Sequence, residues 1–381
     1  MRRVFLVSVS VGLAGIERRF VNLWRLLRAR GRVEPILVVS SVQARILRAA
    51  GLLPDDADGV VENPVSPAVA WLTEAEVPAA LALPKVVLQS RLLGRGYQRR
   101  WSSMQATSGA VLHLGLPCSA ITPPDMPAVY ECVHAGLGGF RSRHFRIAAR
   151  RRVVVHCQTA RIHRALDATY AGLHPKWETV TNPTYFAHYP EGEPAVRDSQ
   201  VLAFVGRLVP MKAPLLFIEA VAQARRRGAL WKVLMLGDGP MRGEVEAAIR
   251  THGLTGVVQP TFEPDAPARL AEAAVFASLQ TGDNYGSQAL LEAMGAGCAI
   301  VATNVGQTAD IVTPEVGICV SPTGEAVADA LCRLWADPEG TRARGLAAAH
   351  RARTVFSADR YAAFVESLYE RAVQFHREEA P

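Results

Sequence analysis

The segment VLAFVGRLVPMKAP (201–214) combines residue types that could bind phosphate oxygens. A continuously apolar run ends at Gly206, Arg207 follows it, and Lys212 comes just before a helical pattern. Glycine lets a backbone approach a ligand closely, and two cations can hold the oxygens of a diphosphate. Similar turns after a strand are often merely solvated, so this segment alone is a weak indication of function.

A second turn, LGDGP (236–240), also lies between an apolar run and a helical pattern, and Gly237 is its first glycine. Gly-Asp-Gly-Pro forms turns in proteins of every kind. This turn becomes informative through its position, because we expect it on the same sheet edge as Gly206.

The third segment is a polar loop followed by a helix. The loop contains Asn284, Tyr285 and Gly286, and a helix is predicted to open near Ser287. Free N–H groups at a helix start, together with the helix dipole, form a site suited to a phosphate. Glu292 follows inside the helix, where its carboxylate could accept both hydroxyls of a ribose. The alternative for this glutamate is an ion pair at the edge of the core.

Apolar, β-branched runs alternate with helical patterns along the chain. Most of these runs are continuously hydrophobic, which predicts strands buried on both faces of a parallel sheet. The predicted strands are 2–10, 33–40, 85–89, 110–114, 128–133, 153–156, 201–206, 231–237, 257–260, 274–279 and 298–303. The predicted helices include 17–30, 213–226, 241–251, 286–296, 323–335 and 358–378.

This alternation predicts the α/β class, with two doubly wound parallel sheets. Segment 183–200 is rich in proline and charge and has no period, so it is predicted to link a domain at 1–182 to a domain at 200–357. Ligands of such sheets usually bind at the carboxyl ends of the strands. We therefore expect the three segments described above to meet at one edge of the second sheet.

Positive charge is concentrated in the first half. Residues 1–182 carry 24 Lys and Arg against 12 Asp and Glu, whereas the whole chain has a net charge of +7. The excess suggests a phosphorylated acceptor, a lipid-diphosphate acceptor or peripheral contact with an anionic membrane. An arginine-rich coding bias explains it equally well. No nucleic-acid-binding signature accompanies the charge, so nucleic acid is not an expected partner.

The sequence gives no indication of a metal site or a membrane span. Cysteines stand at positions 118, 132, 157, 298, 319 and 332 without C-x-x-C spacing, and we expect them to be reduced and mostly buried. No apolar run reaches the roughly 18 residues of a membrane-spanning helix. The apolar run 4–16 lacks a signal-peptide cleavage site, so we expect a cytoplasmic protein.

Taken together, these segments resemble the family 4 glycosyltransferases of the GT-B fold, a group of retaining enzymes that use nucleotide sugars. The resemblance rests on GIERRFVNLWRLLRARG (15–31), FVGRLVPMK (204–212), LGDGP (236–240), LLEAMGAGCAIVATNVG (290–306) and the closing helix. The fourth motif is specific, and the others are loose individually. The resemblance implies two Rossmann-like domains that face one another across a cleft, with the helix at 358–378 packed back on the first.

The resemblance also implies roles for individual residues. Gly15 would line a phosphate loop in the first domain. Arg207 and Lys212 would neutralise the diphosphate, and Glu292 would bind the ribose. The nucleotide-sugar donor would therefore lie on the second domain.

The histidine and carboxylate positions are less settled. His134, in VYECVHAG, stands where the family often has a histidine that contacts the donor sugar, although a hydrogen-bonded strand-end histidine is an equal alternative. His113 is predicted to be structural. The family has a carboxylate, seven intervening residues and then the glutamate, but counting back from Glu292 gives Asn284. Either one extra loop residue gives the role to Asp283, which we prefer narrowly, or Asn284 takes it without charge.

The implied reaction moves a sugar from a nucleotide diphosphate to an acceptor hydroxyl with retention of anomeric configuration. His134, Arg207, Lys212 and Asp283 form the expected catalytic set. No metal or cofactor is expected, and the nucleotide-diphosphate sugar is a co-substrate. The acceptor would be a lipid-linked or polysaccharide glycan or a small metabolite. The alternatives are a nucleotide-sugar 2-epimerase and a non-catalytic nucleotide-sugar-binding partner subunit.

Overall fold

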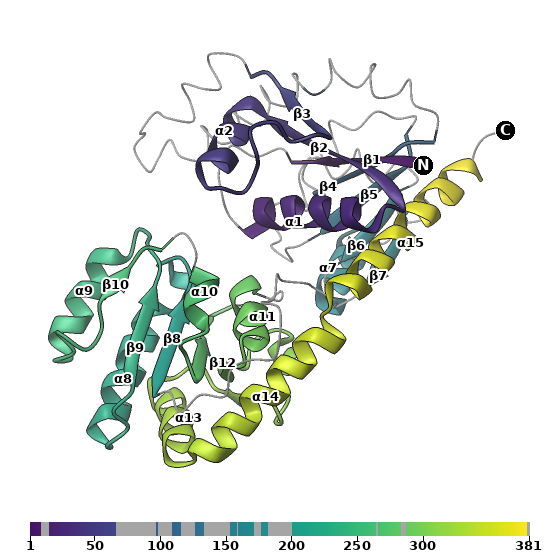
Figure 1. Cartoon of the computed structure of the whole chain (residues 1–381). Helices are drawn as coiled ribbons and strands as arrows, with labels where there is room; N and C mark the ends of the chain where they lie inside the picture. Colours follow the sequence, from purple (N-terminus) through teal and green to yellow (C-terminus); the bar gives the residue numbers. More distant parts are fainter. Residues whose placement is uncertain are drawn as a thin grey trace. The chain divides into compact units, whose positions relative to one another are not determined.

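The computed structural model describes residues 1–8, 15–65, 97, 109–115, 126–132, 153–157, 159–170, 177–181, 200–263, 266–282 and 287–378. The chain divides into two compact units, one formed by Met1–Pro183 with Ala362–Pro381 and the other by Thr184–Tyr361. Each unit is built on one parallel β-sheet (Figure 1). The predicted α/β class with two parallel sheets is confirmed. In the described part of the chain no helix has both the length and the apolar character of a membrane span.

The sheet of the first unit has seven strands in the order β3-β2-β1-β4-β5-β6-β7. They are β1 (Arg2–Val7), β2 (Val33–Ser40), β3 (Val60–Asn63), β4 (Val111–Gly115), β5 (Ala128–Cys132), β6 (Val153–Cys157) and β7 (Trp177–Thr181). The sequence did not predict β3 and β7, which form the two edges. The strand predicted at 85–89 lies outside the described residues.

The helices described in the first unit are α1 (Gly15–Arg30), α2 (Ser41–Ala49), α7 (Ala160–Tyr170) and α15 (Ala358–Arg377). Helix α15 begins in the second unit and enters the first at Ala362. The apolar stripe predicted for α1 is real, since Phe20, Leu23 and Leu27 are all buried. Helix α2 was not predicted; it follows β2 without a loop, and Ser40 caps it by accepting a hydrogen bond from the Gln43 N–H at 3.1 Å.

Charged and polar side chains lie inside the first unit, beneath α1 and α15. Glu131 on β5 forms an ion pair with Arg19 on α1, and its other oxygen lies 3.0 Å from Nε2 of His113 on β4. His113 Nδ1 lies 2.8 Å from the hydroxyl of Tyr369 on α15. Burial, and then the charges of Arg19 and His156, hold the pKa of His113 well below its usual range. His113 is therefore a neutral structural residue that joins the sheet to α15.

The sheet of the second unit has six strands in the order β10-β9-β8-β11-β12-β13. They are β8 (Val201–Val205), β9 (Lys232–Leu236), β10 (Pro260–Thr261), β11 (Val275–Ser278), β12 (Ala299–Thr303) and β13 (Gly317–Val320). The strand predicted at 257–260 is wrong in its bounds, because pairing with β9 occurs only at Pro260 and Thr261 and a turn precedes them. The sequence did not predict β13.

Helices cover both faces of this second sheet (Figure 1). They are α8 (Pro214–Arg226), α9 (Arg242–Thr251), α10 (Ala266–Leu270), α11 (Gln288–Gly295), α12 (Thr308–Ile311), α13 (Gly324–Ala336) and α14 (Pro338–Val355). Successive strand residues point to opposite faces, so Leu202 and Phe204 pack with α8, α9 and α13 while Ala203 packs with α11 and α14. Both faces are therefore buried, which explains why the strand sequences are continuously apolar.

Candidate functional site

Three loops of the second unit lie side by side because they follow neighbouring parallel strands. Strands β9, β8 and β11 are adjacent, so the loops after them share the carboxyl edge of the sheet. The N–H of Leu208 donates to the carbonyl of Asp238 at 2.9 Å, and the N–H of Thr281 donates to the carbonyl of Met211 at 3.3 Å. The loop at 206–213 is thereby held from both sides. This edge is where ligands bind to doubly wound sheets.

The glycines of the LGDGP turn are needed for contact with the neighbouring loop. A Cβ atom on Gly237 would lie 1.9 Å from the carbonyl oxygen of Gly206, and one on Gly239 would lie 2.6 Å from the carbonyl oxygen of Leu208. No side chain fits at these distances. The two glycines thus let two backbone turns pack directly on one another.

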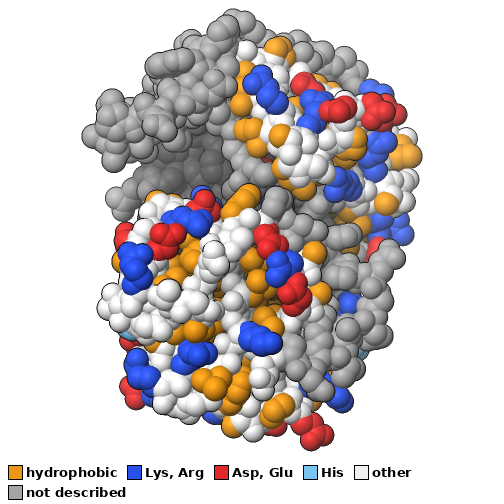
Figure 2. Space-filling model, turned by 60° about the vertical axis from the view of Figure 1, so that its left-hand side comes forward, with side chains coloured by type: hydrophobic (Ala, Val, Ile, Leu, Met, Phe, Trp, Pro, Cys, Tyr) orange, Lys and Arg blue, Asp and Glu red, His pale blue; other side chains and the backbone are white. Residues whose placement is uncertain are grey.

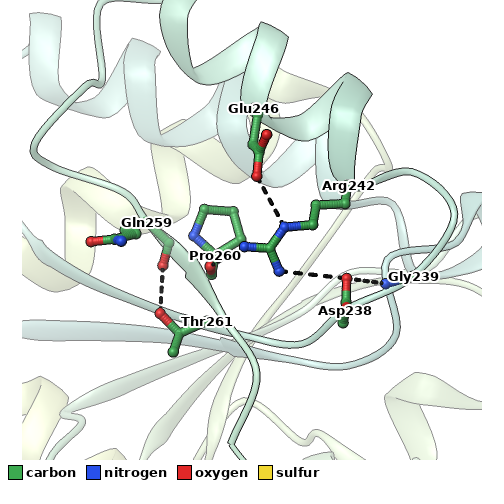
Figure 3. A network of polar contacts seen from close by, with 7 residues as sticks. All are labelled: Asp238, Gly239, Arg242, Glu246, Gln259, Pro260 and Thr261. Atoms are coloured by element: carbon green, nitrogen blue, oxygen red, sulfur yellow. Dashed lines mark hydrogen bonds and ion pairs between the residues drawn. The ribbon is translucent and has the colours of Figure 1, made fainter.

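Polar contacts centred on Arg242 fix the same turn from its other side (Figure 3). Its guanidinium donates to Glu246 Oε1 at 3.0 Å and to the carbonyl of Pro260 at 3.2 Å, and lies 3.5 Å from Asp238 Oδ1. Asp238 Oδ1 also accepts a hydrogen bond from the Gly239 N–H at 2.8 Å. The aspartate of the turn therefore contacts both the turn's own backbone and Arg242.

The two cations of the central loop, Arg207 and Lys212, have no acidic partner among the described residues. Arg207 is exposed, whereas Lys212 is half-buried in the short 3₁₀ turn η3 (Pro210–Lys212). Burial, and then the charge of Arg207, lower the pKa of Lys212. A desolvated ammonium beside a second cation favours an anion as its partner. Gly206 lies beneath this lysine, since a Cβ there would contact Lys212 Cγ and Cδ at 3.8 Å.

Helix α11 contributes its amino end and Glu292 to the same unit. Ser287 precedes the helix in an extended conformation, and its side chain does not cap the helix. The N–H groups of Leu290 and Leu291 donate to the Ser287 carbonyl at 3.0 and 3.2 Å, which forms the first turn of α11. Glu292 is half-buried one turn into the helix, between the fully buried Leu291 and Ala293.

Sequence reasoning did not identify Thr303, which fixes the loop after β11. Its buried hydroxyl accepts from the Gln280 N–H at 2.8 Å and contacts the Gln280 carbonyl at 2.8 Å. The available signal was a hydroxyl residue at the end of the otherwise apolar run CAIVAT.

Several predicted site residues lie outside the described residues: His134, Asp283, Asn284, Tyr285 and Gly286. Gly15 is the first residue of α1. The structure therefore brings together Gly206, Arg207, Lys212 and Gly237 at one sheet edge. Ser287 lies directly before helix α11 and Glu292 lies within it. Within the described ranges no group of three or more His, Cys, Asp and Glu side chains is placed to hold a metal ion.

Residues 199–337, which contain these three loops, match the model of a family described as glycosyl transferases group 1. Two curated proteins are similar over a comparable stretch. The 2-deoxystreptamine glucosyltransferase of Streptomyces kanamyceticus is 32% identical over 143 residues, or 36% of this chain and 37% of that protein. The D-inositol 3-phosphate glycosyltransferase of Kribbella flavida is 31% identical over 169 residues, or 41% and 40% of the two chains. The chain thus matches only about two fifths of these relatives' length.

Solved structures resemble the chain over almost its whole length. Sucrose-phosphate synthase from Thermosynechococcus elongatus has a TM-score of 0.72 at 16% identity and covers 97% of this chain and 99% of its own. The Anabaena protein HepE in complex with UDP has a TM-score of 0.70 at 17% identity, with coverage of 97% and 100%. At these identities the likeness concerns the fold, and the predicted GT-B fold is confirmed.

Proposed function

We propose that this chain transfers a sugar from a nucleotide diphosphate to an acceptor hydroxyl, because residues 199–337 match the model of the glycosyl transferases group 1 family. The observation that carries the proposal is the pair Arg207 and Lys212, two cations without an acidic partner in the described residues, at the carboxyl edge of the second sheet. A diphosphate supplies the missing negative charge. The long likeness to glycosyltransferase structures supports the same activity.

The barrier to the reaction is charge separation, because the sugar gains oxocarbenium character while the diphosphate leaves as an anion. Lys212, Arg207 and the positive end of the α11 dipole would stabilise the leaving diphosphate, as fixed charges and dipoles do in a site that excludes water. These groups supply the charge that a metal provides elsewhere, so we propose a metal-independent reaction. Glu292 would accept the ribose hydroxyls and orient the nucleoside.

We propose retention of anomeric configuration, as the resemblance to the family 4 enzymes implies. His134 and Asp283 are the residues proposed to contact the donor sugar, with Asn284 as the alternative to the aspartate. Anomeric configuration of the product, assigned by proton NMR on a fresh reaction, tests retention directly.

The donor and acceptor classes follow from the relatives. HepE was solved with UDP, and a pneumococcal O-GlcNAc transferase with UDP and GlcNAc, which makes UDP-sugars the first donors to test. The names of the two curated relatives specify 2-deoxystreptamine and inositol phosphate, both small polyhydroxylated rings. We therefore propose a small polyhydroxylated acceptor, with lipid-linked and polysaccharide glycans as the other classes to screen.

Peripheral membrane contact remains a proposal that rests on the basic composition of residues 1–182. On the face in Figure 2 acidic and basic side chains are interspersed across the described surface. Sedimentation with anionic vesicles at low and high salt tests the proposal, since an electrostatic attachment weakens as salt rises. Sedimentation that is absent at both salt concentrations would refute it.

The first test of the proposed function is a thermal-shift screen against UDP-, GDP-, ADP- and dTDP-sugars in the presence of a chelator. A ligand that binds only the folded state raises the melting temperature, by an amount set by its concentration relative to its Kd. Lys212→Ala should reduce the shift at a given ligand concentration. Lys232→Ala is the matched control, because Lys232 is an exposed lysine at the amino end of β9. The candidate site lies at the carboxyl ends of the same strands.

The outcomes separate the candidate functions. A shift followed by sugar transfer supports the glycosyltransferase. Binding without turnover of any donor would identify a non-catalytic nucleotide-sugar-binding protein. No shift with any donor would overturn the proposal.

A further inference from the structure

One residue beside the candidate phosphate site adopts a conformation that its side chain disfavours. Ala213 has φ 48° and ψ 48°, and it is the only non-glycine residue with positive φ among those the structure describes. The left-handed region suits glycine and brings the Cβ atom of other residues close to the following carbonyl oxygen. Pro214 follows, and proline restricts the preceding residue to extended conformations. Two independent effects thus oppose this backbone conformation.

The surrounding loop is built to hold Ala213 in place. Its N–H donates to the carbonyl of Pro210 at 3.0 Å, which closes the turn η3. Thr281 binds the same turn from the loop after β11, through its N–H to Met211 and its hydroxyl to Pro210 at 3.4 Å. Ala213 is only 6% exposed and lies in the core cluster that contains Phe217. Unfavourable conformations of this kind persist where the structure over-determines them, and they cluster at functional sites.

The left-handed residue joins two elements with different directions, the turn η3 and helix α8. Lys212, the last residue of η3, therefore has its stem against Gly206 and its half-buried ammonium beside Arg207. An extended residue 213 would continue the chain away from Gly206 and carry Lys212 with it.

We propose that Ala213 is a positioning residue whose left-handed conformation holds Lys212 over the Gly206 turn, ready to bind a diphosphate. The inference deepens the proposed function and rests on it. A lysine held in this way before binding would strengthen binding, because binding then imposes less ordering.

Two substitutions separate conformation from size. Ala213→Gly keeps the left-handed conformation at no steric cost, so its Kd for UDP should stay within about twofold of wild type. Ala213→Val makes that conformation a severe outlier, because a β-branched side chain crowds the backbone, and its Kd should rise at least tenfold. Ala222→Val is the control for overpacking, since Ala222 is similarly buried but lies within the regular helix α8.

A double-mutant cycle with Lys212→Ala distinguishes positioning from general damage. If Ala213 acts through Lys212, Ala213→Val should weaken UDP binding in the wild-type background and leave the Lys212→Ala background unchanged. Equal weakening in both backgrounds would overturn the inference. A tenfold loss in Ala213→Gly, which folds without strain, would also overturn it, because the buried methyl and not the backbone conformation would then be responsible.

A readout without nucleotide keeps this inference separable from the proposed function. The pH dependence of Lys212 acetylation by acetic anhydride, followed by mass spectrometry, reports the ammonium's environment in the free protein. Ala213→Val should move the midpoint toward that of an ordinary exposed lysine, such as Lys232 in the same sample. An unchanged midpoint would refute the positioning role, whereas a shifted midpoint in a protein that binds no nucleotide would refute only the proposed function.

Discussion

Substituting Gly237 by alanine tests the packing of two turns on which the candidate site depends. The new Cβ atom would lie 1.9 Å from the Gly206 carbonyl oxygen, whereas real contacts of this kind are essentially never below 3.0 Å. One of the two turns must therefore move by about 1 Å. The turn that contains Gly206 also lies beneath Lys212, so the displacement reaches the candidate phosphate site.

The magnitude follows from what the displacement breaks. Overpacking in a fixed environment costs about 1–3 kcal/mol. The hydrogen bonds from the Gly206 N–H to Leu236 at 3.0 Å and from the Gly237 N–H to Thr261 at 2.8 Å are at risk, and each is worth about 0.5–1.5 kcal/mol. We expect a loss of about 3 kcal/mol in the free energy of unfolding of the second unit. For a unit of this size that corresponds to a fall of about 6–12 °C in Tm.

Differential scanning calorimetry of Gly237→Ala measures this fall, and titration with UDP measures the accompanying loss of affinity. Gly243→Ala is the matched control, because Gly243 is exposed on α9 and a Cβ there meets nothing within 4 Å. The control should melt at or slightly above the wild-type temperature, since alanine is the better helix former. A Gly237→Ala protein that melts within about 2 °C of wild type would refute the packing argument.

Three further predictions concern charged and polar groups. Lys212→Met should weaken UDP binding by about 10-fold to 100-fold, as expected for a charge-assisted contact worth about 1.5–3 kcal/mol. The affinity of the wild-type protein for UDP, measured calorimetrically, should fall as pH rises through the lowered pKa of Lys212. The variant should show no such fall. Tyr369→Phe removes the hydroxyl that contacts His113 and should cost about 1–2 kcal/mol in urea unfolding, whereas an unchanged midpoint would contradict the contact. The pKa of His113 is lowered on folding, so the unfolded chain takes up a proton near pH 6.5 that the native protein does not. The free energy of unfolding should therefore fall as pH drops below about 6.5. A His113→Asn protein whose free energy of unfolding depends on pH with the same slope would refute this assignment.

The strands that the sequence identified are mostly central, and those it missed are edges. Strands β8, β11 and β12 are covered on both faces, and their sequences are apolar without interruption. Strands β3, β7 and β13 each lie at an edge, as does β10, whose bounds were wrong. An edge strand pairs on one side only and is less fully covered, so its sequence need not be continuously hydrophobic. The hydrophobicity of a strand sequence therefore depends on how fully the strand is covered as well as on its being a strand.

Some features of the candidate site could be predicted from neighbouring residues in the sequence, and others depend on contacts between distant segments. Arg207 and Lys212 were candidates from the sequence alone, because a glycine and cations after a buried strand form a local pattern. The requirement for glycine at position 237 depends on the pairing of β8 with β9, which the sequence does not specify. The left-handed Ala213 gave no signal at all, since alanine followed by proline favours an extended backbone.

The first unit is assembled from two stretches of chain that are separated by the whole of the second unit. During synthesis, residues 1–183 emerge well before α15, and at about 5–20 residues per second the delay is roughly 10–35 s. Throughout that interval the sheet face that carries His113 and Glu131 lacks the helix that covers it in the native protein. The second unit, which is one uninterrupted stretch, is synthesised during this interval and is complete before the last residues of α15 emerge. The first unit is thus begun first and completed last, because it gains its final helix only after the second unit has been synthesised.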